Sequence, residues 1–179
     1  AFIAVSSGVQ VVVIVPTTLL AIQHYETFKN RFKDFKVSIA QLSRLVPKSK
    51  FSSIKSDLAN GHIDIVIGTH ALLSKDITFD NLGLLIIDEE QHFGVRHKEK
   101  IKELRSNIHI LTLTATPIPR TLQLALVGVR EMSLIATPPS NRLGIDTFIL
   151  PYDPLIIRRV MMREMKRGGQ IFFVCPRIK

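Results

Sequence analysis

Residues 84–91 read Leu-Leu-Ile-Ile-Asp-Glu-Glu-Gln, four aliphatic residues followed directly by three carboxylates and an amide. A continuous apolar run of this kind predicts a strand buried on both faces, as in a parallel sheet covered by helices. Ligands of open α/β sheets bind at the carboxyl ends of the strands, which is where Asp88 and Glu89 stand. A strand that runs into a solvated acidic loop fits the same residues, so other segments must distinguish the two interpretations.

The two acids have the chemistry that a nucleotide-hydrolysing site needs. Asp88 would hold Mg²⁺ through the water shell of the ion, and Glu89 would take a proton from the water that attacks the γ-phosphate of ATP. Both are therefore candidate catalytic residues, and Asp88 is also the candidate metal ligand.

Further apolar runs predict strands at residues 11–15, 37–42, 63–67 and 110–113. Helices are predicted between them from Thr17 onward, over Phe51–Ala59, in a basic segment up to Arg105, and over Pro119–Val127. Strands that alternate with helices in this way predict an α/β fold with a parallel sheet.

Short polar segments follow three of these strands: Pro16-Thr17-Thr18, Thr69-His70 and Thr114-Ala115-Thr116. Hydroxyls beside a helix N-terminus can bind a phosphate of nucleic acid, although simple helix capping is the commoner use of Thr17 and Thr18. A lone histidine such as His70 is more often a structural hydrogen-bonding residue than a ligand contact. The loop from Thr114, stiffened by prolines, would sense whether the γ-phosphate is present.

The composition favours an acidic partner such as nucleic acid. Lys and Arg number 24 against 15 Asp and Glu, a net charge of +9, although the same balance fits an ordinary solvated surface. A single cysteine, Cys175, excludes an internal disulfide and fits a reducing compartment. No apolar run reaches the roughly 20 residues that a membrane helix needs, and no signal peptide is present. We therefore expect a soluble, cytoplasmic protein.

The carboxyl-terminal part predicts a second, incomplete domain. Residues 136–142 break regular structure as a domain linker would. Around this linker we expect strands at residues 132–135, 145–150 and 171–174 and a basic amphipathic helix at residues 154–167. So few elements cannot bury a core by themselves. At the other end, Ala1–Val5 before Gly8 has the pattern of a last helical turn, so we expect a chain cut from a longer protein.

These segments together resemble motifs Ia, Ib, II and III of superfamily 2 helicases. The resemblance is strongest to bacterial transcription-repair coupling factors and next to RecG-type branch-migration helicases. Residues 94–99 and 136–139 favour the coupling factors, whereas residues 114–121 fit both groups. The matching segments are Val15–Ala21, Ile67–His70, Asp88–Glu99 and Thr112–Thr121.

The resemblance implies a RecA-like, P-loop NTPase fold without its first strand and phosphate-binding loop over residues 1–143. It implies the linker and beginning of a second RecA-like domain over residues 144–179. The activity it implies is that of an ATP- and Mg²⁺-dependent double-stranded DNA translocase. Such an enzyme displaces stalled RNA polymerase and brings in the damage-recognition protein of nucleotide excision repair.

The resemblance also assigns roles by position. Asp88 would be the Mg²⁺ acid, and Glu89 would be the catalytic base. Thr114, Ala115 and Thr116 would couple hydrolysis to movement. The DNA backbone would be contacted by Pro16, Thr17, Thr18, Thr69 and His70.

Three departures from the family pattern limit these expectations. The sequence contains no G-x-x-x-x-G-K-[ST] loop, the arginine-bearing motifs of a second domain would lie beyond Lys179, and His92 stands where relatives commonly carry arginine. We therefore expect no ATP hydrolysis by the 179-residue chain alone. A RecG-like enzyme that remodels forks, and a non-catalytic nucleic-acid-binding module with a steep salt dependence, remain as alternatives.

Overall fold

A computed structural model of the chain describes residues 1–93, 108–115, 131–138 and 144–174. The chain divides into two units, Ala1–Met132 and Ser133–Lys179. The predicted domain boundary after residue 143 adjoins residues outside the described part, so it stays a prediction. The basic segment before Arg105, the predicted helix at 119–127 and Thr116 also lie outside the described residues.

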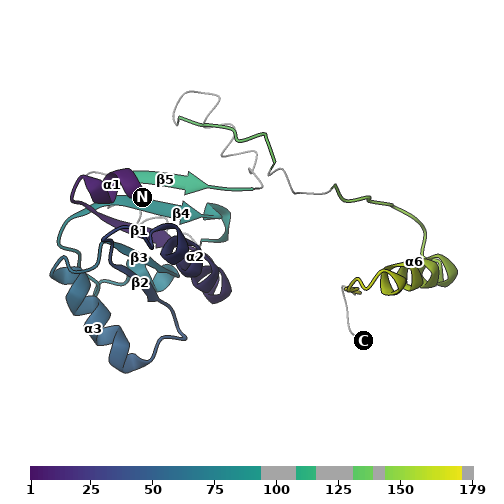
Figure 1. Cartoon of the computed structure of the whole chain (residues 1–179), viewed down its shortest axis with the longest axis horizontal. Coiled ribbons are helices and arrows are strands. Elements are labelled where there is room, and N and C mark those ends of the chain that lie inside the picture. Colours follow the sequence, from purple (N-terminus) through teal and green to yellow (C-terminus); the bar gives the residue numbers. More distant parts are fainter. Residues whose placement is uncertain (94–107, 116–130, 139–143, 175–179) are drawn as a thin grey trace. The chain divides into compact units, whose positions relative to one another are not determined.

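A five-stranded parallel sheet forms the first unit, in the order β2-β3-β1-β4-β5 (Figure 1). The predicted α/β fold is confirmed, and all five strands predicted before residue 114 are present. They shift by no more than two residues at either end. Their bounds are β1 (Gln10–Ile14), β2 (Ile39–Leu42), β3 (Ile65–Gly68), β4 (Leu82–Asp88) and β5 (His109–Leu113).

Helices cover both faces of the sheet, and their ends follow local sequence signals. The bounds are α1 (Phe2–Ser6), α2 (Thr18–Arg31), α3 (Lys48–Ala59) and the single 3₁₀ turns η1 (His70–Leu73) and η2 (Glu90–His92). Helix α2 begins where the Thr17 hydroxyl accepts a hydrogen bond from the Leu20 N–H at 3.2 Å. Beyond α1, Gly8 has a φ of 77°, which confirms the predicted glycine at the end of that helix.

Strand β1 is buried on both faces and divides the core into two layers. Val11 and Val13 pack on the side that holds α1 and α2, whereas Val12 and Ile14 pack on the side that holds α3 and η1. Successive side chains of a strand point to opposite faces, so a run without polar residues fills both layers. This packing fixes the loop after β1 on a rigid support.

The buried amide of Gln10 joins three segments at the amino edge of the sheet. Its Nε2 donates to the carbonyls of Leu58 at 3.0 Å and Ile63 at 2.8 Å, and its Oε1 accepts from the Asn81 N–H at 3.1 Å. Gln10 is only 5% exposed, and its two carbonyl partners belong to the buried residues Leu58 and Ile63. A polar residue in this buried strand therefore serves to join the ends of α3 and the segment before β4.

We expect Gln10→Leu to lower the free energy of unfolding by about 2–3 kcal/mol, because it leaves buried backbone groups without their partner. Gln23→Leu, at an exposed position of α2, should change it by less than about 0.5 kcal/mol. Urea unfolding followed by circular dichroism measures both values. Equal midpoints for the two variants would contradict a structural role for the Gln10 amide.

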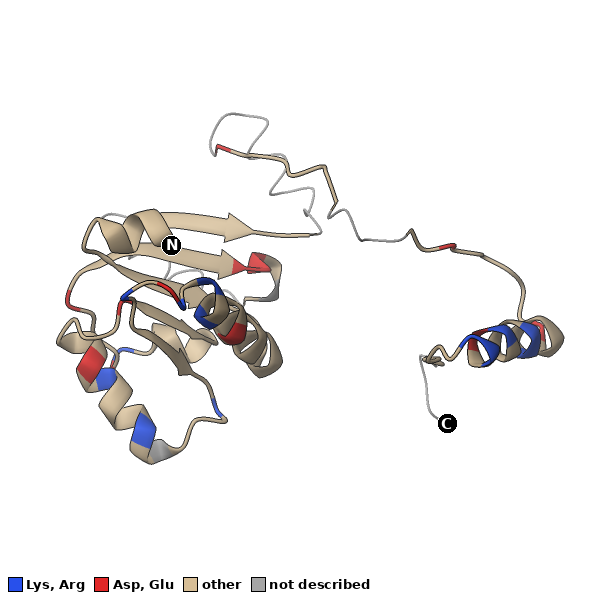
Figure 2. Ribbon diagram, viewed as in Figure 1, with Lys and Arg blue, Asp and Glu red and all other residues tan. Residues whose placement is uncertain are grey.

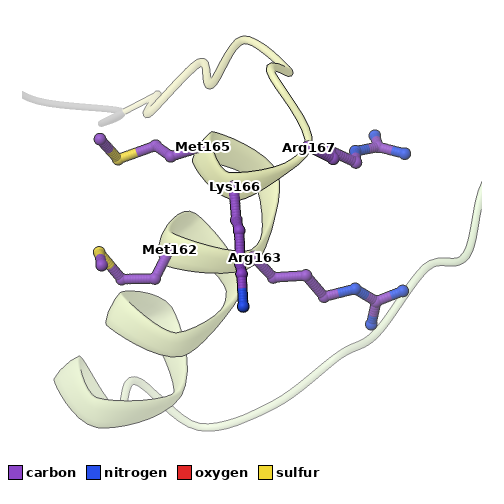
Figure 3. Close-up of a pocket in the computed structure, with 5 residues that line it drawn as sticks. All are labelled: Met162, Arg163, Met165, Lys166 and Arg167. Atoms are coloured by element: carbon purple, nitrogen blue, oxygen red, sulfur yellow. The ribbon is translucent and has the colours of Figure 1, made fainter.

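The second unit contains helix α6 (Pro154–Lys166), which confirms the helix predicted at residues 154–167. The Asp153 carboxylate caps it by accepting from the N–H groups of Leu155 at 2.7 Å and Ile156 at 3.4 Å. Met162 and Met165 project from the side of the helix opposite Arg163 and Arg167 (Figure 3). These side chains, with Lys166, line a shallow hollow of about 660 Å³. The helix is therefore amphipathic, with most of its apolar side chains exposed.

The strands predicted at residues 132–135, 145–150 and 171–174 are wrong, because none of these segments forms regular structure. Most of their apolar side chains are exposed, as Ile135 and Ile149 are at 90% and 96%. A strand exists only when it pairs with a neighbour, and no described residue pairs with these segments. Apolar runs alone therefore overpredicted strands here. No helix in the described part of the chain has the length and apolarity to cross a membrane.

Candidate nucleotide and DNA site

The order of the parallel strands brings the predicted polar segments to one edge of the sheet. Ile14 lies opposite both Gly68 and Ile87, and Asp88 lies opposite Leu113. The residues that follow β3, β1, β4 and β5 therefore form a row at the carboxyl edge. Figure 2 shows the acidic residues at the end of β4, in red, within this row.

Asp88 ends β4 directly after Ile87, which is completely buried. Its Oδ2 lies 3.2 Å from Nε2 of His24 on α2, and the two side chains are 21% and 27% exposed. An ionised carboxylate can only accept, so the proton of this hydrogen bond belongs to Nε2 of the histidine. The carboxylate is thus held from one side and reaches solvent on the other.

This arrangement fits a metal that is held mainly by a nucleotide. Within the described residues, no group of three or more histidine, cysteine or acidic side chains is placed to hold a metal ion. Mg²⁺ at nucleotide sites takes one or two protein carboxylates and completes its shell with water and phosphate oxygens. A single partly exposed carboxylate at a strand end is the donor set that such a site requires. Asp88 is the residue that would hold the ion.

Glu89 has a left-handed backbone, with φ 55° and ψ 53°, and it is the one non-glycine residue of the described chain with positive φ. This conformation is unfavourable for a side chain with a Cβ atom. It turns the chain sharply from β4 into η2, while the Glu89 N–H still donates to the Leu113 carbonyl at 2.9 Å. The turn prevents Glu89 from continuing the strand and aims its side chain along the carboxyl edge.

The Glu89 carboxylate meets the loop after β5. Its Oε2 accepts from Nε2 of Gln91 and lies 3.5 Å from the Thr114 hydroxyl. That hydroxyl also lies 3.3 Å from Oε1 of Gln91. The acid predicted as catalytic base and the threonine predicted as coupling residue therefore belong to one polar cluster, which we call the Glu89–Gln91–Thr114 cluster. The next residue, Ala115, is exposed.

The five residues predicted to contact DNA follow β1 and β3, up to the first residues of α2 and η1, but they differ in exposure. Thr17 is exposed, Pro16, Thr18 and His70 are half-buried, and Thr69 is only 5% exposed. The Thr17 oxygen accepts from the Leu20 N–H, which leaves its own O–H as a donor. Thr17 and Thr18 therefore offer the larger surface for a phosphate, and Thr69 offers little.

Sequence reasoning missed two members of the site, His24 and Gln91. A signal for His24 was present, because it follows the buried Ala21 by three residues and precedes Phe28 by four. This spacing places a histidine on the face of α2 that packs on the sheet. Gln91 carried no comparable signal, since its position depends on the left-handed turn at Glu89.

Comparison with known proteins shows which family the chain resembles. Residues 2–125 match the family model of the DEAD/DEAH box helicases. The chain is 52% identical over its whole length to the transcription-repair-coupling factor of Bacillus subtilis. It is 53% identical, over 97% of its length, to that of Escherichia coli. It spans only 15% of the length of either relative.

Solved structures of helicases also match the chain. The structure of RecG bound to a three-way DNA junction matches 90% of this chain and 22% of its own, with 39% identity and a TM-score of 0.71. The second domain of the DEAD-box helicase Mss116p matches 69% of this chain and 49% of its own, with a TM-score of 0.53. At 16% identity it supports the fold alone. The predicted resemblance to the coupling factors and RecG-type helicases is confirmed, and the chain belongs to the DEAD/DEAH box helicase family.

Proposed function

We propose that this chain supplies the acid, the base and part of the DNA contact of an ATP-dependent double-stranded DNA translocase. In the whole protein this motor would displace stalled RNA polymerase and couple transcription to nucleotide excision repair. The observation that carries the proposal is that the Glu89 carboxylate and the Thr114 hydroxyl lie close together, beside Asp88, at one edge of the sheet. The names of the relatives support the biological role.

The chemical roles follow from the positions of the side chains. Bound Mg²⁺ would neutralise charge on the phosphates of ATP. Asp88, held by His24, would carry the water shell of the ion. Glu89 would accept the proton of the attacking water, and the Glu89–Gln91–Thr114 cluster would fix the orientation of its carboxylate. A preoriented base needs no rearrangement before proton transfer, which favours the reaction.

The same edge would bind the DNA backbone. The Thr17 hydroxyl and the N–H groups that begin α2 are donors for a phosphate oxygen, and the net charge of +9 favours a polyanion. Phosphate contacts of this type position a protein without reading the sequence, as a translocase requires. We propose duplex DNA, RNA polymerase and the excision-repair damage-recognition protein as partners, and a cytoplasmic location.

A chimera tests the function. Residues 1–179 replace the matching segment of the Bacillus subtilis coupling factor, with which the chain is 52% identical. We expect ATP turnover stimulated by duplex DNA, and displacement of a stalled RNA polymerase. The isolated chain should hydrolyse no ATP, because no lysine of a phosphate-binding loop is present in its sequence. DNA binding without any turnover in the chimera would support a non-catalytic module instead.

A RecG-like role is the second candidate, favoured by the match to the RecG structure. The two roles predict different preferred substrates for the proteins that contain this chain. In a chimera with a RecG-type helicase in place of the coupling factor, a RecG-like chain would support branch migration of a three-way junction. Failure there, together with polymerase displacement in the first chimera, would favour the coupling factor.

We expect Thr114→Val to lower DNA-stimulated ATP turnover of the coupling-factor chimera by about tenfold, the effect of losing roughly 1.4 kcal/mol of transition-state stabilisation. Valine keeps the volume but removes the hydroxyl that lies near both Glu89 and Gln91. Thr114→Ser keeps that hydroxyl and should retain most of the activity. Translocation, measured by triplex displacement, should fall at least as far as turnover. Equal activity of the valine and serine variants would remove Thr114 from the proposed mechanism.

A further inference from the structure

Within the described part of the chain, His24 is the side chain that forms a hydrogen bond with the Asp88 carboxylate. It belongs to helix α2 and not to a loop of the site. Its Nε2 lies 3.2 Å from Oδ2 of Asp88. The helix turn that carries it is anchored, because Ala21, three residues earlier, is completely buried against the sheet. The hydrogen bond therefore joins two rigid elements, α2 and β4.

A hydrogen bond between rigid elements restricts the rotation of the Asp88 side chain. An aspartate at a strand end has an open side toward solvent, and its carboxylate would otherwise sample several orientations. With Oδ2 bound to His24, the other carboxylate oxygen is the one left to face a water of the metal shell. Outer partners of this kind orient metal-binding groups and change metal affinity without touching the ion.

We propose that His24 is a positioning residue for Asp88, holding the carboxylate in the orientation that receives hydrated Mg²⁺ with nucleotide. This inference rests on the proposed function, because it assigns a partner to the acid of that site. His24 acts through Asp88 and does not contact the substrate. An ordinary exposed ion pair would contribute little, but both side chains here are about three-quarters buried and their backbones are fixed.

The test compares His24→Leu, His24→Gln and wild type in the coupling-factor chimera. Glutamine places an N–H donor near the position of Nε2, whereas leucine fills the space without a donor. We expect leucine to raise the KM for Mg²⁺ in DNA-stimulated ATP turnover by about tenfold, with a smaller change in kcat at saturating Mg²⁺. Glutamine should restore most of the Mg²⁺ affinity. Gln23→Leu on the exposed side of α2 controls for the added apolar surface.

A second readout needs no turnover. Mn²⁺ binding in the presence of a non-hydrolysable ATP analogue, followed by electron paramagnetic resonance, should weaken about tenfold in His24→Leu and recover in His24→Gln. Equal Mn²⁺ affinities of wild type and His24→Leu would overturn the positioning role, as would a glutamine variant no better than leucine. Asp88→Asn separates the two proposals. If it binds Mn²⁺ like wild type, the assignment of Asp88 itself is wrong; if it loses binding while His24→Leu does not, only the role of His24 fails.

Discussion

Replacing Glu89 with glutamine will lower DNA-stimulated ATP turnover of the coupling-factor chimera by about 10²–10⁴-fold, the contribution typical of a positioned general base. Glutamine has the shape of glutamate but cannot accept a proton at neutral pH, so the attacking water keeps both of its protons. The amide can still contact Gln91 and Thr114, which are the neighbours of the carboxylate. Nucleotide and DNA binding should therefore change by only a few fold.

Glu90→Gln is the matched control, because it removes the same charge one residue farther along the chain. Glu90 begins η2 and follows the left-handed turn, so its side chain does not share the position of Glu89. We expect its turnover to stay within a few fold of wild type. Steady-state ATP hydrolysis with saturating duplex DNA measures both variants. Loss of turnover in Glu90→Gln with normal turnover in Glu89→Gln would exchange the two acids in the mechanism.

The backbone of Glu89 gives an independent reason to assign it a function. A glutamate in the left-handed region costs of order 1–2 kcal/mol, and glycine would relieve that cost. Strained positions of this kind gather at functional sites, where the surrounding structure maintains them. Here the left-handed conformation directs the Glu89 carboxylate toward the loop after β5, where it lies 3.5 Å from the Thr114 hydroxyl. The left-handed dihedral angles of Glu89 and its position at the end of β4 therefore support the same role.

The sequence predicted the sheet well, because a strand that is buried on both faces is a continuous run of apolar residues. Leu84–Ile87 and residues 11–15 are continuous apolar runs, and the structure buries nearly all of their side chains. Once such strands are parallel, their carboxyl ends must meet at one edge. The proximity of Asp88 and Thr114 was therefore predictable without knowing a single distance.

Other features depended on contacts that no local pattern encodes. The left-handed turn at Glu89 and the position of Gln91 follow from how β4 leaves the sheet beside β5. The contact between His24 and Asp88 joins residues 64 positions apart. The three wrong strands beyond residue 131 fail for a related reason, since a strand needs a pairing partner and an apolar run shows only that a segment suits one.

Among the glycines that the structure describes, Gly68→Ala should be the most damaging substitution, lowering the free energy of unfolding by about 3 kcal/mol or more. A Cβ atom at residue 68 would lie 2.2 Å from the Leu42 carbonyl oxygen and 2.9 Å from Cδ1 of Leu72. The first neighbour is the backbone of β2, which pairs with Gly68 and cannot move without breaking the sheet. Thermal unfolding should show a midpoint about 10 °C lower.

Two other glycines separate crowding from backbone strain. Gly144 has open space and no positive φ, so alanine there should be nearly neutral; Gly8 has open space but a φ of 77°, so alanine should cost about 1 kcal/mol. Gly68 belongs to the segment that resembles helicase motif Ib, and a motif residue is easily taken for a DNA contact. If steric crowding is the reason why residue 68 is a glycine, the DNA affinity of the Gly68→Ala variant will fall only in proportion to its unfolded fraction. The affinity will then recover on cooling. Weak DNA binding by a fully folded Gly68→Ala protein would instead place the DNA backbone directly against residue 68.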